Sequence, residues 1–162
     1  ITADNARLVS NLHANLGGLY RMNAHPDLAR EHMEKSISLL DQFNLLHIND
    51  SIPQIANYAM FLTEQQEPER GISELQKLSG IIKEYHSDDC LDYAKVQETL
   101  GTIYLMTANL PQAKTHFKRA FKIYEKIWAD EPEMIEAKYQ EIQELYPQIG
   151  FCIGKTLSGL LT

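Results

Sequence analysis

The most constraining feature of this sequence is a frame of positions that recurs every 42 residues. Gly17, Ala59 and Gly101 are small residues that occupy the same slot in three successive copies. A second small slot follows twelve positions later, and large apolar residues surround both. These slots hold Ala29, Gly71 and Ala113 (small) and Tyr20, Leu62, Tyr104, Met33, Leu75 and Phe117 (large). An internal repeat of this length is typical of arrays of one helical unit.

The small slots predict close helix crossings. Two antiparallel helices approach to about 8 Å only where small residues meet, so we expect each first-slot residue to pack on the small residue twelve positions later. Short turns with a proline near the second helix separate the helices, and Asn109 is an expected N-cap. The expected helices span 3–22, 26–47, 51–65, 68–86, 89–107, 110–129 and 133–146. We also interpret Asp88 and Asp89 as a cap of the helix at 89–107.

Apolar residues at helical spacing predict the core faces of the second helices. One stripe comprises Ile72, Leu75, Leu78, Ile82 and Tyr85, and another comprises Ala113, Phe117, Ala120, Tyr124 and Ile127. Trp128 follows the second stripe and is expected to join the core rather than to form a ligand platform.

The third copy of the frame resembles the tetratricopeptide repeat, whose signature runs Leu-Gly-x2-Tyr, then Ala, then Phe and Ala. The matching residues are Leu100, Gly101, Tyr104, Ala113, Phe117 and Ala120. The resemblance implies an all-α fold, a right-handed α-solenoid of antiparallel helix pairs with three full repeats and one partial repeat. The 42-residue period is similar to the long repeat of kinesin light chains. We expect one domain over 1–162, with repeats at about 10–51, 52–93, 94–135 and a partial repeat at 136–162.

Composition narrows the class of protein. A formal net charge of −7 argues against a nucleic-acid binder, which needs a basic face to meet phosphates. No apolar run approaches the roughly 18 residues that suggest a membrane span. Two cysteines cannot build a disulfide framework, which favours a reducing, cytoplasmic location. The chain begins at Ile1 without a leader, which we interpret as a fragment of a larger protein.

No motif for catalysis is present in the sequence: there is no phosphate loop, dinucleotide fingerprint or nucleophile elbow. His13, His25 and His32 are close in sequence but are expected on different elements, whereas a zinc site needs convergent ligands. We therefore expect no enzyme, no metal and no cofactor.

The resemblance implies that ligands contact fixed slots of the first helices, which line a groove. The candidate groove residues are Asn11, Asn15, Arg21, Met22, Asn57, Met60, Lys95, Thr99, Thr102 and Met106. Asn15 and Asn57 occupy the same slot, and a side-chain amide both donates and accepts hydrogen bonds. Methionines would supply an adaptable apolar wall. The alternative is that the asparagines bond to neighbouring helices.

These features predict a non-catalytic scaffold that binds a protein or an extended peptide. The alternative function is a peptide-sensing regulatory domain of a bacterial signalling or transcription regulator. The apolar tail, Ile149–Thr162, is interpreted as a helix packed on the last repeat, although its apolar residues are unusual for a capping helix, which normally has a polar outer face. A cut edge of a longer array, or a self-association surface for a homo-oligomer, is the other interpretation.

Overall fold

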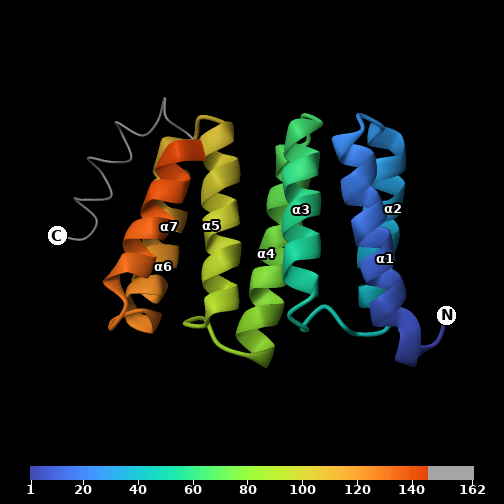
Figure 1. The fold of residues 1–162 in the computed structure, drawn as a ribbon, viewed down its shortest axis with the longest axis horizontal. Helices are drawn as coiled ribbons and strands as arrows, with labels where there is room; N and C mark the ends of the chain where they lie inside the picture. The colour runs from blue at the N-terminus through green and yellow to red at the C-terminus, as the bar shows by residue number, and fades with distance from the viewer. Residues whose placement is uncertain (146–162) are drawn as a thin grey trace. The chain divides into compact units, whose positions relative to one another are not determined.

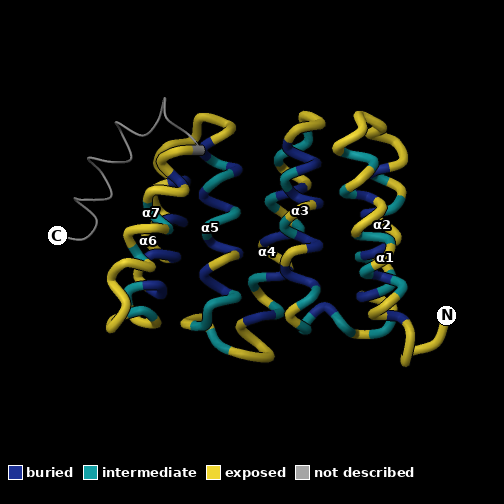
Figure 2. The backbone as a smooth tube through the Cα atoms, in the orientation of Figure 1, coloured by how far each residue is buried: buried dark blue, intermediate teal, exposed yellow. Residues whose placement is uncertain are grey.

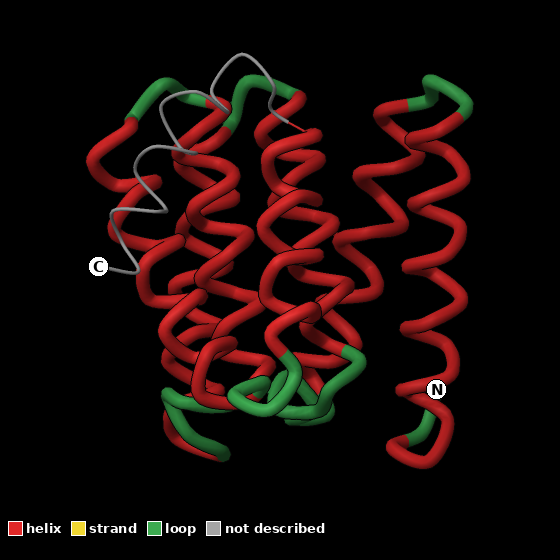
Figure 3. The backbone as a smooth tube through the Cα atoms, turned by 60° about the vertical axis from the view of Figure 1, so that its left-hand side comes forward, coloured by secondary structure: helices red, strands yellow, loops and turns green. Residues whose placement is uncertain are grey.

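The structure is a computed structural model that describes residues 1–145. The described residues form helices and no strand (Figure 3). The helices are α1 (Ala3–Met22), α2 (Pro26–Gln42), α3 (Ser51–Glu64), α4 (Pro68–Tyr85), α5 (Leu91–Met106), α6 (Leu110–Ile127) and α7 (Pro132–Leu145). The apolar tail, Ile149–Thr162, lies outside the described residues, and so does its expected packing on the last repeat. No helix within residues 1–145 is long and apolar enough to span a membrane.

The chain divides into two compact units, residues 1–87 and residues 88–162. In the first unit α1 pairs with α2 and α3 pairs with α4, while α2 and α1 also contact α3 (Figure 1). In the second unit α5 pairs with α6, and α6 contacts α7. The predicted helix pairs are confirmed. That all repeats form one domain stays a prediction, because the two units are described separately.

Within residues 1–145, the helix boundaries agree with the prediction to within one residue, except at the end of α2, the start of α5 and the end of α6, which ends at Ile127 rather than at 129. Helix α2 ends at Gln42 rather than at 47, because Asn44 has a left-handed backbone with φ 54° that stops the helix. Helix α5 begins at Leu91 rather than at 89. Its N-cap is Cys90, whose sulfur accepts a hydrogen bond from the Tyr93 backbone N–H at 3.4 Å. The interpretation of Asp88 and Asp89 as the cap is therefore wrong. The N-cap expected at Asn109 is confirmed, since its side chain accepts from the Gln112 N–H.

Small residues bring the paired helices together. A Cβ added to Gly71 would lie 2.6 Å from the carbonyl oxygen of Ala59, and one added to Gly17 would lie 3.3 Å from that of Ala29. These two predicted crossings are confirmed. At Gly101 the nearest atoms belong to the ring of Phe117, at 3.0 Å, so the predicted packing on Ala113 stays a prediction. The third crossing thus depends on an aromatic ring that covers the glycine.

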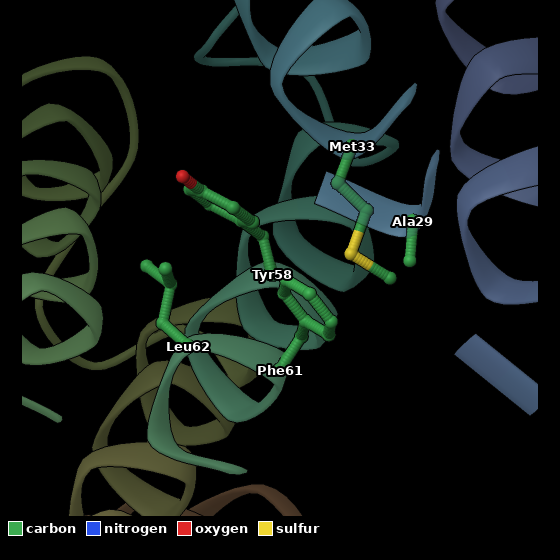
Figure 4. Close-up of a cluster of buried hydrophobic side chains, with 5 residues drawn as sticks. All are labelled: Ala29, Met33, Tyr58, Phe61 and Leu62. Carbon is green, nitrogen blue, oxygen red and sulfur yellow. The ribbon is translucent and has the colours of Figure 1, made fainter. Parts of the chain in front are cut away.

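The predicted stripes form most of the core. Five buried residues of α2 and α3 make one apolar cluster, which Figure 4 shows: Ala29, Met33, Tyr58, Phe61 and Leu62. Figure 2 shows buried residues recurring along the length of α3 and α5. The ends of both stripes, Tyr85 and Ile127, are exposed, since they lie at the last turns of their helices. Trp128 is half-buried and stacks on the buried Tyr124, with ring centroids 4.8 Å apart.

The same turn joins the two helices of each full pair. Its central residue has a positive φ in all three copies, at Ala24 (58°), Gln66 (65°) and Ala108 (59°), which are 42 residues apart. The residue after each of these donates its N–H to the helix carbonyl five residues earlier, for example His25 to Tyr20 at 2.9 Å. This pattern is the Schellman motif, which usually has glycine at the left-handed position.

Glycine at these turns is expected to stabilise the protein. A non-glycine residue in the left-handed region costs about 1–2 kcal/mol, so Ala108→Gly should raise the free energy of unfolding by about 1 kcal/mol. The matched control is Ala137→Gly in the exposed part of α7, where glycine should cost about 1 kcal/mol. Denaturant unfolding of both variants tests the sign. Destabilisation by Ala108→Gly would contradict the turn geometry.

Candidate functional site

A cleft of about 540 Å³ opens in the first unit between α1 and α3, with α2 behind it. Its lining residues are Asn11, Ala14, Asn15, Gly18, Arg21, Met22, Met33, Ser36, Asp50, Pro53, Gln54 and Asn57. The α1 members are spaced by three and four residues, which places them on one face of the helix. Five predicted groove residues of this unit therefore meet at one cleft. The sixth, Met60, is half-buried on α3 and does not line it.

The inner wall of the cleft is a buried polar network that ties three helices together. The hydroxyl of Ser10 on α1 lies 3.0 Å from the Ser36 carbonyl oxygen and 2.8 Å from Oε1 of Gln54. The Ser36 hydroxyl donates to the same Gln54 oxygen. All three side chains are buried. Because each polar group has a partner, the network fixes α1, α2 and α3 without leaving an unsatisfied group.

The network continues from Gln54 to the rim of the cleft. Nε2 of Gln54 donates to Oδ1 of Asn11 at 2.5 Å, and Nδ2 of Asn11 donates to Asp50 at 3.0 Å. Arg7 donates twice to the same carboxylate, at 2.6 and 3.0 Å. Hydrogen bonds from Arg7 and then from Asn11 hold the pKa of Asp50 below its usual value. For Asn11 the structure thus shows the alternative, in which the amide bonds to a neighbouring helix.

Asn15 and Asn57 are different, because both are exposed on the walls of the cleft. Within residues 1–145, neither amide makes a hydrogen bond to another protein group. Asn15 projects from α1 and Asn57 from α3, in the same slot of two successive repeats. Gly18 lies one turn beyond Asn15, and beyond its own stretch of helix backbone no atom lies within 4 Å of where its Cβ would be. The two amides therefore border open space that a ligand backbone can enter.

Arg21 lines the cleft but is already paired. Its Nε donates to Glu64 at 2.9 Å, and its Nη2 donates to the other oxygen of the same carboxylate. The negative charge of Asp50 is neutralised in the same way by its ion pair with Arg7. The cleft therefore carries little net charge, and the paired Arg21 offers little attraction to an acidic ligand.

The remaining predicted groove residues belong to α5 in the second unit. Lys95, Thr99, Thr102 and Met106 are spaced by four, three and four residues, which places them on one face of that helix. The Thr99 hydroxyl donates to the Lys95 carbonyl oxygen at 3.0 Å. Since the two units are described separately, the extension of the cleft to these residues stays a prediction.

Ser36, Gln54 and Asp50 line the cleft but are not among the predicted groove residues. A signal was present in the repeat frame, because the slot of Ser36 holds Leu78 and Ala120 in the next two copies. A polar residue at an otherwise apolar slot needs a buried partner. In this fold the partner is Gln54.

The histidines take part in helix packing. Nδ1 of His13 and Nδ1 of His32 lie 2.8 Å apart, and His32 stacks on Tyr20 with ring centroids 5.3 Å apart. Burial, followed by the nearby His32, lowers the pKa of His13. The same stack recurs 84 residues later between Tyr104 and His116. In the part of the chain that the structure describes, no three His, Cys, Asp or Glu side chains are grouped to hold a metal ion.

Comparison with known proteins identifies the repeat. Residues 51–126 match the family model described as Tetratricopeptide repeat. No curated protein matches the chain. Together with the consecutive helix pairs, the match gives an all-α fold of the tetratricopeptide α-solenoid class, whereas kinship with the kinesin light chains stays a prediction. We conclude that residues 51–126 of the chain are tetratricopeptide repeats, which are the repeats of protein–protein interaction scaffolds.

Proposed function

We propose that the chain is a non-catalytic scaffold that binds an extended peptide segment of a partner protein in the cleft between α1 and α3. The observation that carries the proposal is the pair of exposed amides, Asn15 and Asn57, on opposite walls of that cleft. Both belong to the same repeat slot, so a ligand in the cleft would meet a side-chain amide at two positions along its length.

An extended peptide requires this kind of partner. Each of its residues carries one N–H and one C=O group, and these lose water when the peptide enters a cleft. A side-chain amide can donate to the C=O and accept from the N–H. Two such amides recognise the peptide backbone and read little of its sequence. The open space at Gly18 allows the backbone to come close to α1.

The side chains of the ligand would be selected by the rest of the lining. Met22 is exposed at one end of the cleft and offers a flexible apolar surface. Because the Arg21 and Asp50 charges are internally balanced, we expect neutral and apolar peptides to bind better than strongly acidic ones.

The electrostatics of the cleft favour binding over catalysis. Acid–base catalysis needs a titratable group whose pKa is tuned near the working pH. The pKa of Asp50 is lowered, which keeps this carboxylate charged and paired. The cytoplasmic location, the absence of nucleic-acid binding and the regulatory alternative stay predictions. So does self-association through the tail.

The test begins with a peptide array screened against the chain and continues with titration calorimetry of the best binder. Asn57→Ala should weaken that peptide about ten- to a hundredfold, since a peptide group left unpaired costs about 1–3 kcal/mol. Asn15→Ala should act in the same direction. The matched control is Asn49→Ala, an exposed asparagine in the α2–α3 loop that does not line the cleft.

The control should leave the affinity unchanged. Equal affinities for the parent, Asn15→Ala and Asn57→Ala, with all three proteins folded, would place the binding surface outside this cleft.

A further inference from the structure

Helix α1 exposes a row of four leucines, Leu8, Leu12, Leu16 and Leu19, which we call the leucine face. These side chains are 64%, 55%, 39% and 55% exposed. Their spacing of four, four and three residues places them along one side of the helix, where Figure 2 shows much of α1 as exposed. A regular apolar row of this kind marks an interaction surface rather than chance exposure.

The repeat frame shows what the leucine face is built to meet. Forty-two residues later, Leu16 corresponds to Tyr58 and Leu19 to Phe61. Tyr58 and Phe61 are only 4% and 1% exposed. They belong to the apolar cluster that α3 forms with Ala29 and Met33 of α2 (Figure 4). The equivalent face of α3 is therefore covered by the second helix of the preceding repeat.

We propose that the leucine face packs against the second helix of a further tetratricopeptide repeat that precedes α1 in the same polypeptide. The incoming helix would carry a small residue in the slot of Ala29 and an apolar residue in the slot of Met33. This proposal is independent of the peptide-binding function, because none of the four leucines lines the cleft.

Leu12 adds a specific requirement. Its equivalent in α3 is Gln54, which satisfies the buried hydroxyls of Ser10 and Ser36. A leucine cannot hydrogen-bond to such hydroxyls. The preceding repeat must therefore hold apolar residues in these two slots, as the second repeat does with Ile52 and Leu78.

The test adds a repeat to the chain in the observed register. Residues 1–50 are placed directly ahead of Val9, because position 51 is the equivalent of position 9 and the natural α2–α3 link is kept. The added copy carries Ser10→Ile and Ser36→Leu, and a matched extension keeps both serines. We expect the apolar extension to melt at a higher temperature than the parent, and the serine extension to gain less.

A double substitution reports whether the face is covered. Leu16→Glu with Leu19→Glu should change the melting temperature of the parent only slightly, since both side chains are exposed there. In the apolar extension the same change buries charge, so the loss should be at least about three times larger. Hydrogen exchange of α1 should slow in the extension and recover in its double variant.

Three results would overturn the proposal. The first is an equal effect of the double substitution in parent and extension. The second is a failure of both extensions to protect α1. The third is a concentration-dependent dimer of the parent, seen by analytical ultracentrifugation and abolished by Leu16→Glu with Leu19→Glu, which would assign the face to a second copy of the chain.

Discussion

Phe61→Ala is expected to lower the free energy of unfolding by about 3–5 kcal/mol, since removing a buried aromatic side chain loses its transfer energy and leaves a cavity. Phe61 is almost completely buried at the α2–α3 interface, beside Ala29 and Met33. Its ring also lies 5.6 Å from the guanidinium carbon of Arg30, a cation–π contact that the variant loses. The α2–α3 interface joins the two helix pairs of the first unit, so weakening this interface should destabilise the whole unit.

The matched control uses the same slot one repeat earlier. Leu19→Ala truncates an exposed side chain, and surface changes of this kind usually stay within about 0.5 kcal/mol. Denaturant unfolding of both variants, monitored by circular dichroism, measures the difference. Similar losses for Phe61→Ala and Leu19→Ala would mean that the two slots are buried alike, against the structure.

The sequence alone predicts the order and pairing of the helices because the information is local and repeated. Glycine or alanine returns every 42 residues, and apolar side chains recur at helical spacing between them. A helix pair that crosses at Gly17 and Ala29 crosses again at Ala59 and Gly71 for the same steric reason. Each copy of the frame supports the interpretation of the others, so no single residue decides the fold.

The predictions that fail depend on contacts the frame does not encode. Helix α2 stops at Gln42, before its predicted end at 47, because Asn44 has a left-handed backbone with φ 54°. At α5, the capping group is a cysteine sulfur, which is a weak acceptor that residue preferences rank below aspartate. Neither Asn44 nor Cys90 occupies a slot of the repeat frame, so the repeat carries no information about these helix ends.

The candidate site was predicted in part for the same reason. The shared slot of Asn15 and Asn57 follows from the repeat and places both amides on the cleft. The partners of Asn11 and Arg21 do not follow from it, because Asp50 and Glu64 lie 39 and 43 residues away along the chain and occupy no slot of the frame. A slot shows which face a residue occupies but not which side chain reaches it from a neighbouring helix.

Gly71→Ala is expected to destabilise the first unit by about 1–3 kcal/mol, as overpacking of a closely packed crossing does. The added Cβ would lie 2.6 Å from the carbonyl oxygen of Ala59 and 3.2 Å from its Cα. These are backbone atoms of α3, and the Thr63 hydroxyl also donates to that oxygen at 2.9 Å. Since no flexible side chain can move aside, the two helices must separate.

Gly80→Ala, on the same helix, is expected to stabilise the protein. No atom lies within 4 Å of a Cβ at Gly80, so the variant should gain the helix propensity of alanine, about 1 kcal/mol. Gly101→Ala should fall between the two, because the Phe117 ring at 3.0 Å can shift by the small amount required. Thermal and denaturant unfolding of the three variants tests this order. Stabilisation by Gly71→Ala would show that α3 and α4 do not cross at this residue, and the crossing would then have to be placed elsewhere along the pair.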